Sequence, residues 1–226
     1  MNLSELRNAT RTMVNDQAEP YRWPDEDIDR RLNNAVREAC IRARLLKDDA
    51  DSLPKLCSID YTAGQKTVTY ASEILVVRNG AIYCMVDKLW ALSAESMDKV
   101  APGWDSTLQP SVPTYLVVDL SQKRLRLVPT PDTAGTLKLR VWRMPLDSEL
   151  MVDDSDEPVI ALPDPEELCH WAAYECYMVK DAETLDSAAA ATELALFEQR
   201  FGSRPSLHDM ARWADSPPRV RHAHLF

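Results

Sequence analysis

Residues 23–39 read WPDEDIDRRLNNAVREA, and this stretch does most to decide the fold. Pro24 suits a first helical turn, and the three acidic residues that follow it complement the positive end of a helix dipole. Apolar residues then recur at helical spacing, at Ile28, Leu32, Ala35, Val36, Ala39, Ala43 and Leu46. The pattern predicts one amphipathic helix over roughly residues 24 to 47.

A shorter helix precedes this one, and two more follow the middle of the chain. Ser4 is suited to cap the first, whose apolar residues recur at helical spacing up to Val14. From Pro163 the same spacing returns in two segments, and the second ends at Gly202, which is well placed as a C-cap. The residues predicted to face inward from these two segments are Leu168, Trp171, Ala172, Cys176, Val179, Ala190, Leu194, Phe197 and Phe201.

The middle of the chain shows a period near two instead of 3.6, after a polar break at residues 48–54. Asn79-Gly80 separates two apolar runs and predicts a tight hairpin, because both residues tolerate a positive φ. A brief helical turn is predicted over residues 93–98. Strands are predicted over residues 66–70, 74–78, 81–86, 114–119, 124–128 and 136–142.

These elements predict an α+β fold in which a helical bundle from both chain ends carries an inserted small antiparallel β domain. The bundle is expected to comprise residues 1–54 and 151–202, and the β domain residues 55–150. Residues 203–226, called the arm below, contain three prolines and no sustained apolar period. We therefore expect the arm to be extended.

Composition narrows the classes of function. The 226 residues are 45% hydrophobic and 27% charged, which allows a core of ordinary size in one or two compact units. The net charge of −10 argues against nonspecific DNA binding, since neutralising phosphates requires a basic surface. The arm has four arginines and two aspartates, so a body of charge −12 carries a tail of +2.

No apolar run approaches the ~20 residues that a membrane helix needs, and the first residues lack the pattern of a signal peptide. We expect a protein of the cytoplasm in which it is made, without contact to a membrane. The five cysteines are scattered within apolar patterns typical of reduced core thiols.

Several residues have both a functional and a purely structural interpretation. Cys169, His170 and Cys176 lie on one predicted helix, but the histidine points about 100° away from its neighbour and no oxyanion motif accompanies them. His222 and His224 are too few for a structural zinc site. The acidic run 153–157 lacks the spacing and glycine of a calcium loop, so we interpret it as a solvated linker. We expect no catalytic residue, cofactor or metal.

Two residues beside the main helix leave alternatives open. Trp23 could anchor a partner, although a tryptophan just before a helix more often packs on its own core. Asn33 could form a contact between subunits or be satisfied within its own chain. Trp171 is predicted to be a core residue.

The arm holds the best candidate partner-binding residues. Apolar and aromatic side chains alternate there with arginines, a mixture that suits binding to a partner, because such residues dominate binding energy at interfaces. The partner would be another protein or a neighbouring subunit, and the alternative is an arm that folds back on its own bundle or remains loose. The candidate residues are Leu207, Met210, Arg212, Trp213, Arg219, Arg221, Leu225 and Phe226.

Four motifs, in this order, give the chain a resemblance to a known family. They are Trp23-Pro24-Asp25 with Ile28, Leu32-Asn33 and Ala35; residues 92–98 leading to Pro102-Gly103-Trp104 and Pro113-Thr114-Tyr115; the strand 125–128 with Pro129-Thr130-Pro131; and Ala161-Leu162-Pro163 with Leu168, Ala172-Ala173 and Asp181. Over residues 20–202 the chain resembles the adaptor, or head-to-tail connector, proteins of tailed bacteriophages. It departs from the pattern at residues 109–112, where glycine is usual before the proline, and in the length of the acidic run.

The resemblance implies a structural virion protein without enzymatic activity, located at the head-to-tail junction and in the host cytoplasm during virus assembly. It implies a homo-oligomeric ring of twelve copies that binds the portal protein and a tail or nozzle protein. Genomic DNA would pass through the channel of the ring without specific binding, and an acidic wall would not retain it. Closed cyclic symmetry requires a heterologous interface, and many copies multiply a modest contact.

The alternative is a β-domain binding module of a phage tail, for carbohydrate or protein. In that interpretation Trp90, Trp104 and Trp142 would be exposed platforms.

Overall fold

The structure is a computed structural model that describes residues 1–77, 82–84, 88–106, 108–121, 123–181, 184–206 and 209. Within this part the chain divides into a helical unit and a β unit, and each is described by itself. The helical unit comprises Met1–Leu46 and Met144–Arg204, and the β unit comprises Lys47–Arg143, with which Pro205–Phe226 are grouped. The α+β class predicted from the sequence is confirmed.

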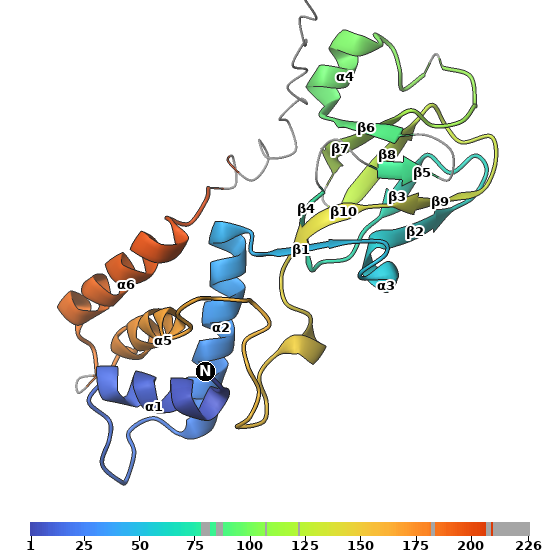
Figure 1. Ribbon diagram of the computed structural model, residues 1–226. Coiled ribbons are helices and arrows are strands. Elements are labelled where there is room, and N and C mark those ends of the chain that lie inside the picture. Colours follow the sequence, from blue (N-terminus) through green and yellow to red (C-terminus); the bar gives the residue numbers. More distant parts are fainter. Residues whose placement is uncertain are drawn as a thin grey trace, which may run out of the picture. The chain divides into compact units, whose positions relative to one another are not determined.

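The helical unit contains four helices of eleven residues or more. They are α1 (Leu3–Met13), α2 (Asp25–Ala43), α5 (Glu167–Tyr177) and α6 (Ser187–Phe201), with a short 3-10 helix, η1 (Asp147–Glu149), in the connection before α5. Helix α5 packs against α1, α2 and α6 (Figure 1). Both ends of the chain therefore contribute to one core.

Helix α1 begins with a capping box that the sequence analysis missed. The Asn2 side chain accepts a hydrogen bond from the Glu5 backbone N–H at 3.0 Å, and Glu5 accepts one from the Asn2 N–H at 3.0 Å. This reciprocal arrangement satisfies two N–H groups that a helix start leaves unpaired. The prediction of Ser4 as the cap was wrong, because Ser4 lies inside the first turn.

Helix α2 begins directly after Pro24 and carries acidic residues through its first turn, as predicted. It is shorter than predicted, because Arg44 adopts the left-handed conformation, with a φ of 53°, and ends the helix at Ala43. Four residues that the periodicity assigned to the helix therefore lie beyond it.

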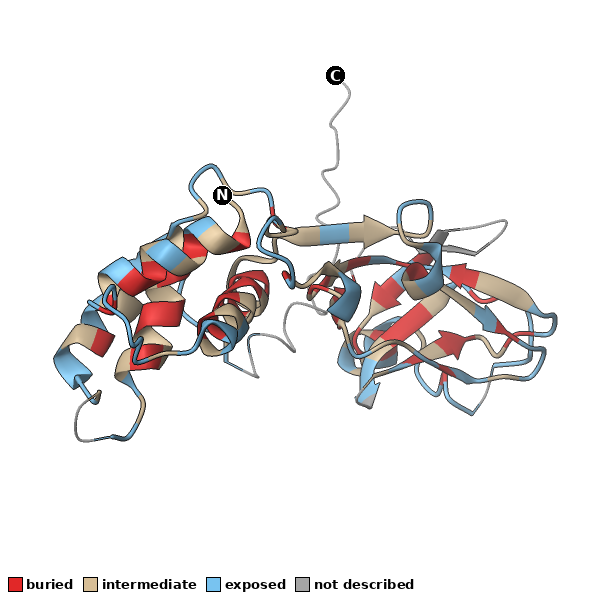
Figure 2. Ribbon diagram, turned by 90° about the horizontal axis from the view of Figure 1, so that it is seen from below, coloured by how far each residue is buried: buried red, intermediate tan, exposed pale blue. Residues whose placement is uncertain are grey.

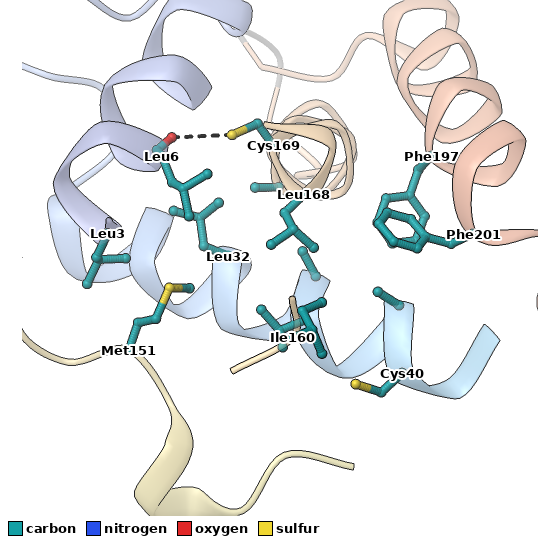
Figure 3. Close-up of a cluster of buried hydrophobic side chains, with 14 of the residues drawn as sticks. Leu3, Leu6, Leu32, Cys40, Met151, Ile160, Leu168, Cys169, Phe197 and Phe201 are labelled. Carbon is teal, nitrogen blue, oxygen red and sulfur yellow. Dashed lines mark hydrogen bonds between the residues drawn. The ribbon is translucent and has the colours of Figure 1, made fainter. Parts of the chain in front are cut away.

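The helical core is a layer of apolar side chains contributed by all four helices (Figure 3). Leu32 from α2 and Leu168 from α5 have no exposed surface, and Phe197 and Phe201 of α6 project toward them. Buried residues gather on the sides of the helices that face one another (Figure 2). Burying each such side chain contributes about 1.5–3 kcal/mol, which makes this layer the main source of stability of the unit.

The acidic run 153–157 is more than a linker. Its backbone carbonyls accept hydrogen bonds from the start of α1, from the Leu3 N–H to Asp156 O at 2.8 Å and from the Ser4 N–H to Asp154 O at 3.2 Å. Arg7 also donates to the Asp154 carboxylate at 2.9 Å. The loop therefore closes the start of α1, while its residues stay largely exposed, as expected for a solvated linker.

The β unit contains two sheets. Three strands pair in the order β1 (Leu46–Asp49), β10 (Arg140–Arg143) and β4 (Ile74–Val77). Two short helices, α3 (Pro54–Cys57) and α4 (Ala94–Val100), accompany the sheets. The second sheet has the order β2 (Ser58–Tyr61), β9 (Gly135–Lys138), β5 (Ile82–Cys84), β6 (Lys88–Leu92), β7 (Tyr115–Ser121), β8 (Arg124–Val128) and β3 (Thr67–Thr69).

The described pairings are antiparallel except for β6 with β7, where Trp90 pairs with Tyr115 in a parallel register. The helical turn predicted between these two strands is α4, capped by the Ser93 side chain, which accepts from the Ser96 N–H. It provides the crossover that a parallel pair requires. The domain is therefore antiparallel with one parallel exception.

The hairpin turn predicted at Asn79-Gly80 lies outside the described part of the structure. Among the described residues, strand β4 pairs with β10, and β5 pairs with β6 and β9.

Candidate assembly interface

All but one of the arm's final twenty residues lie outside the described part of the structure. The eight candidate partner-binding residues are among them: Leu207, Met210, Arg212, Trp213, Arg219, Arg221, Leu225 and Phe226. What the structure does describe is the point at which the arm leaves the helical unit. We call the side chains that fix this point, namely Glu38, Arg42, Glu198 and Arg204, the arm root.

Arg42 is the centre of the arm root. Its Nε donates to Glu38 Oε1 at 2.9 Å, and its Nη1 donates to Glu198 Oε1 at 3.0 Å and to the carbonyl of Gly202 at 3.1 Å. The side chains of Arg42 and Glu38 are only 3% and 7% exposed. One buried guanidinium therefore joins the last turn of α2 to the end of α6.

The spacing of Glu38 and Arg42 along α2 brings their side chains together. Glu38 and Arg42 are four residues apart on α2 and so share one side of it. The guanidinium also lies over the rings of Trp171 and Phe197, 5.1 and 5.3 Å from their centroids. These contacts hold its position, since arginine stacks well on aromatic faces.

The first residues of the arm follow the same cluster. Gly202 adopts a φ of 85° and donates its N–H to Glu198 O at 2.8 Å, so it is the C-cap that the sequence predicted. Arg204 Nε lies 3.4 Å from Glu38 Oε1. The arm therefore leaves on the flank of α6 that faces α2.

A second cluster of charges joins α1 to the start of α2. Arg7 donates to both carboxylate oxygens of Asp29, at 2.7 and 2.8 Å, and Arg11 donates to Asp16 at 2.8 Å. Hydrogen bonding to Asp29 is the largest influence on the Arg7 side chain and raises its pKa. Bidentate pairs of this kind are among the stronger hydrogen bonds in proteins, so they fix the two helices at their ends.

A shallow groove of about 310 Å³ lies between α5 and α6. It is lined by Glu167, His170, Leu196, Gln199 and Arg200. We call it the α5/α6 groove. Close to it, His170 Nδ1 lies 2.6 Å from Glu193 Oε2, an interaction between the two helices that orients the imidazole.

The cysteines that could suggest thiol chemistry are core residues. Cys169 donates its S–H to the carbonyl of Leu6 at 3.4 Å, and burial raises its pKa to about 12. Burial likewise raises the pKa of Cys176 to about 11. A reactive thiol needs a lowered pKa. Among the described residues, no group of three histidine, cysteine or acidic side chains is arranged to hold a metal ion.

Trp23 and Asn33 both serve the helical unit itself. Trp23 is half-buried against the helical core, with the Arg31 guanidinium 5.0 Å from its ring centroid. Asn33 donates to the carbonyl of Met151 at 2.8 Å and accepts from the Met151 N–H at 2.9 Å. The amide of Asn33 thus binds a backbone segment of its own chain, 118 residues away.

The three tryptophans proposed as binding platforms differ in environment. Trp90 is 45% exposed on β6, whereas Trp104 is only 8% exposed and donates its indole N–H to Asp98 at 2.8 Å. Trp142 is half-buried on β10. The prediction of three exposed platforms is wrong for Trp104, because the indole packs into a small core with Met97 and Val117.

Charge is concentrated in one part of the chain. Residues 144–204 contain three basic and fifteen acidic residues, a net charge of −12. Residues 1–46 contain eight of each and are neutral. The net negative charge of the chain therefore comes from the second segment of the helical unit, which includes α5 and α6.

Comparison with known proteins identifies a family. Residues 1–221 match the model of a family described as SU10 adaptor protein. No curated protein matches the chain. In the described part of the chain, no helix has the length and apolar character that a membrane span requires.

Proposed function

The chain belongs to the SU10 adaptor protein family, and from this premise we propose that it forms a ring that joins the portal to the tail of a phage virion. The family consists of structural phage proteins. The ring surrounds a channel for the genome, contains twelve copies, and lies at the head-to-tail junction. The match over nearly the whole chain is the observation that carries this proposal.

In this proposal the helical unit is the rigid part of each subunit. The Arg42–Glu198 contact joins α2 to α6, and the bidentate Arg7–Asp29 pair joins α1 to α2, so that a force on the arm is transmitted to the whole core. Rigid elements lose little freedom on association, which makes a modest contact more effective. A ring then multiplies that contact.

The arm is the proposed partner-binding segment, with the eight residues from Leu207 to Phe226 as its contacts. Its arginines and aromatic residues are the types that dominate binding energy at interfaces. The arm root supports the proposal, because it gives the arm a fixed point of departure. The portal protein and a tail or nozzle protein are the proposed partners of the ring.

The charge of residues 144–204 supports the proposed passage of DNA. A surface of net charge −12 repels phosphates instead of binding them. Substituting exposed acidic residues of this segment by their amides should slow genome passage if the segment lines the channel. Unchanged ejection kinetics would argue against an acidic channel wall.

The experiment that tests the adaptor function is assembly of virions without this chain. We expect heads that have packaged DNA but carry no tails, visible by electron microscopy, and restoration of tails when purified protein is added. Complete virions formed without the chain would contradict the proposal.

The alternative function, a binding module of a phage tail, is favoured by one observation. Trp90 exposes 45% of its surface on β6, as a carbohydrate platform would. Binding of the isolated protein to host-surface glycans, lost in Trp90→Ala, would favour the module. Retention of virion assembly after replacement of every cysteine and histidine would dispose of an enzymatic role.

A further inference from the structure

The α5/α6 groove has a partly apolar and partly charged lining that the internal packing of the helical unit does not use. Leu196 is 40% exposed there and is the apolar residue of the lining. Arg200 Nε lies 3.7 Å from Glu167 Oε1, a long ion pair on the groove wall. An arginine from another segment could replace Arg200 as the partner of Glu167 with little loss of free energy, because ion pairs exposed to this degree contribute about 0–1 kcal/mol.

The size and chemistry of the groove limit its occupant. At about 310 Å³ it is at the lower end of the range for small-molecule sites, and it is open instead of enclosed. Leu196 offers an aliphatic surface for an aromatic side chain, and Glu167 offers a carboxylate for an arginine next to it. The arm contains this pair in sequence, Arg212-Trp213, and the protein segment around the groove has the opposite charge.

We infer that the α5/α6 groove receives the arm of a second copy of this chain. This inference deepens the proposed function, on which it rests, since a ring supplies the second copy. It assigns a definite surface to the interface between subunits, and it makes that interface heterologous, with the arm of one copy on the helical unit of the next, as closed rings require.

The arm root shows why the groove of the same chain is a poor acceptor. Glu198, which holds the exit of the arm through Arg42, and Leu196, which lines the groove, lie about 160° apart around α6. The arm therefore leaves on the flank opposite to its own groove, and Arg204 continues toward Glu38 on α2. To reach its own groove, it would have to reverse direction and pass around the helix.

The arm is long enough to extend well beyond the helix that it follows. Residues 205–226 can span at most about 75 Å when fully extended, whereas α6, with 15 residues, is about 22 Å long. Next to Leu196, on the side of α6 away from Arg200, the exposed residues of the helix are small or uncharged. These residues are Ala188, Ala191, Thr192, Ala195 and Gln199.

The test is a photo-cross-link on the full chain in the presence of portal rings. Chains with p-benzoylphenylalanine in place of Trp213 are mixed in equal amounts with the same protein labelled with ¹⁵N, irradiated, digested and analysed by mass spectrometry. We expect cross-links from position 213 to residues 196–200 or 167–170, half of them joining a labelled to an unlabelled chain. Leu196→Arg should lower their yield at least tenfold.

Leu185→Arg is the matched control, because Leu185 is 50% exposed in the same unit but lies outside the groove. Its cross-link yield should not change. Cross-links within single chains only, or from position 213 to the portal or to other surfaces only, would overturn the inference. If cross-links between labelled and unlabelled chains form at the groove but no protein binds to the portal rings, the result would support the inference and contradict the proposed function.

Discussion

Arg42 and Glu38 form a buried ion pair, with Nε 2.9 Å from Oε1, at the point where the arm leaves the helical unit. The same guanidinium holds the carbonyl of Gly202, and the same carboxylate lies within 3.4 Å of Arg204. Two helices and the start of the arm thus depend on one pair of charges. Removing Arg42 leaves the buried Glu38 carboxylate with only the longer contact to the exposed Arg204, which costs more than the pair itself contributes.

Arg42→Ala should therefore lower the free energy of unfolding of the helical unit by about 3–5 kcal/mol, as measured by urea denaturation. Arg30→Ala is the control, because the Arg30–Asp27 pair on the same helix is largely exposed. Its loss should cost less than about 1 kcal/mol. Equal effects of the two substitutions would show that the buried Arg42–Glu38 pair stabilises the helical unit no more than an exposed pair does.

Asn33→Ala should destabilise the unit by about 2 kcal/mol, because it leaves the N–H and carbonyl of Met151 without the partners seen at 2.9 and 2.8 Å. Asn34→Ala provides the comparison, since the Asn34 amide donates a single hydrogen bond of 3.3 Å to Glu175. We expect that change to have less than half the effect in thermal denaturation. Similar losses at both positions would refute a special role for Asn33.

Acid should loosen the loop that closes α1. The backbone N–H groups of Val152 and Asp153 donate to the Asp156 carboxylate and hold its pKa below its ordinary value of 3.8. A carboxyl with a lower pKa in the folded state stabilises the fold above its unfolded pKa, and this contribution is lost as the pH falls through the folded pKa. The contribution is therefore complete at pH 7, begins to fall below about pH 4, and is lost once the pH is below the folded pKa.

An NMR titration of the Asp156 carboxyl carbon checks this expectation, together with Asp156→Asn, which should remove the acid-induced change in the amide signals of Val152 and Asp153. A pKa for Asp156 at or above 3.8 would contradict the hydrogen-bonded arrangement.

The core thiols should be inert in the folded protein. Burial raises the pKa of Cys169 to about 12 and that of Cys176 to about 11, so at pH 8 the thiolate fraction is on the order of 100-fold or more below that of an ordinary thiol. Alkylation by iodoacetamide, followed by mass spectrometry, should proceed at least that much faster in urea. A cysteine introduced by Ser203→Cys, at an exposed position, should react rapidly in both states.

The helices were predictable because their signals are local. The acidic turn after Pro24, the apolar spacing of α2 and α5, and Gly202 at the end of α6 each depend on neighbours within one or two turns. The end of α2 was not predictable from periodicity, since Arg44 in the left-handed conformation interrupts an apolar pattern that continues to Leu46. The Asn2 cap had a signal, a glutamate three residues later, that was available in the sequence.

Strand pairing was not predictable, for a physical reason. Val76 and Val77 of β4 pair with Trp142 and Val141 of β10, more than sixty residues away, and no local pattern encodes such a partner. The same holds for the site. The four-residue spacing of Glu38 and Arg42 is compatible with an ion pair, a signal that the sequence analysis did not use, and the contact of Arg42 with Gly202 depends on the packing of α2 against α6.

The most direct test of the adaptor function is native mass spectrometry of purified portal rings mixed with the full chain or with a version that ends at Gly202. We predict that the full chain loads in integer multiples to a complete ring, and that truncation weakens the loading. Equal loading by both versions would retain the adaptor and discard the arm as its anchor. No complex with either version would contradict the account.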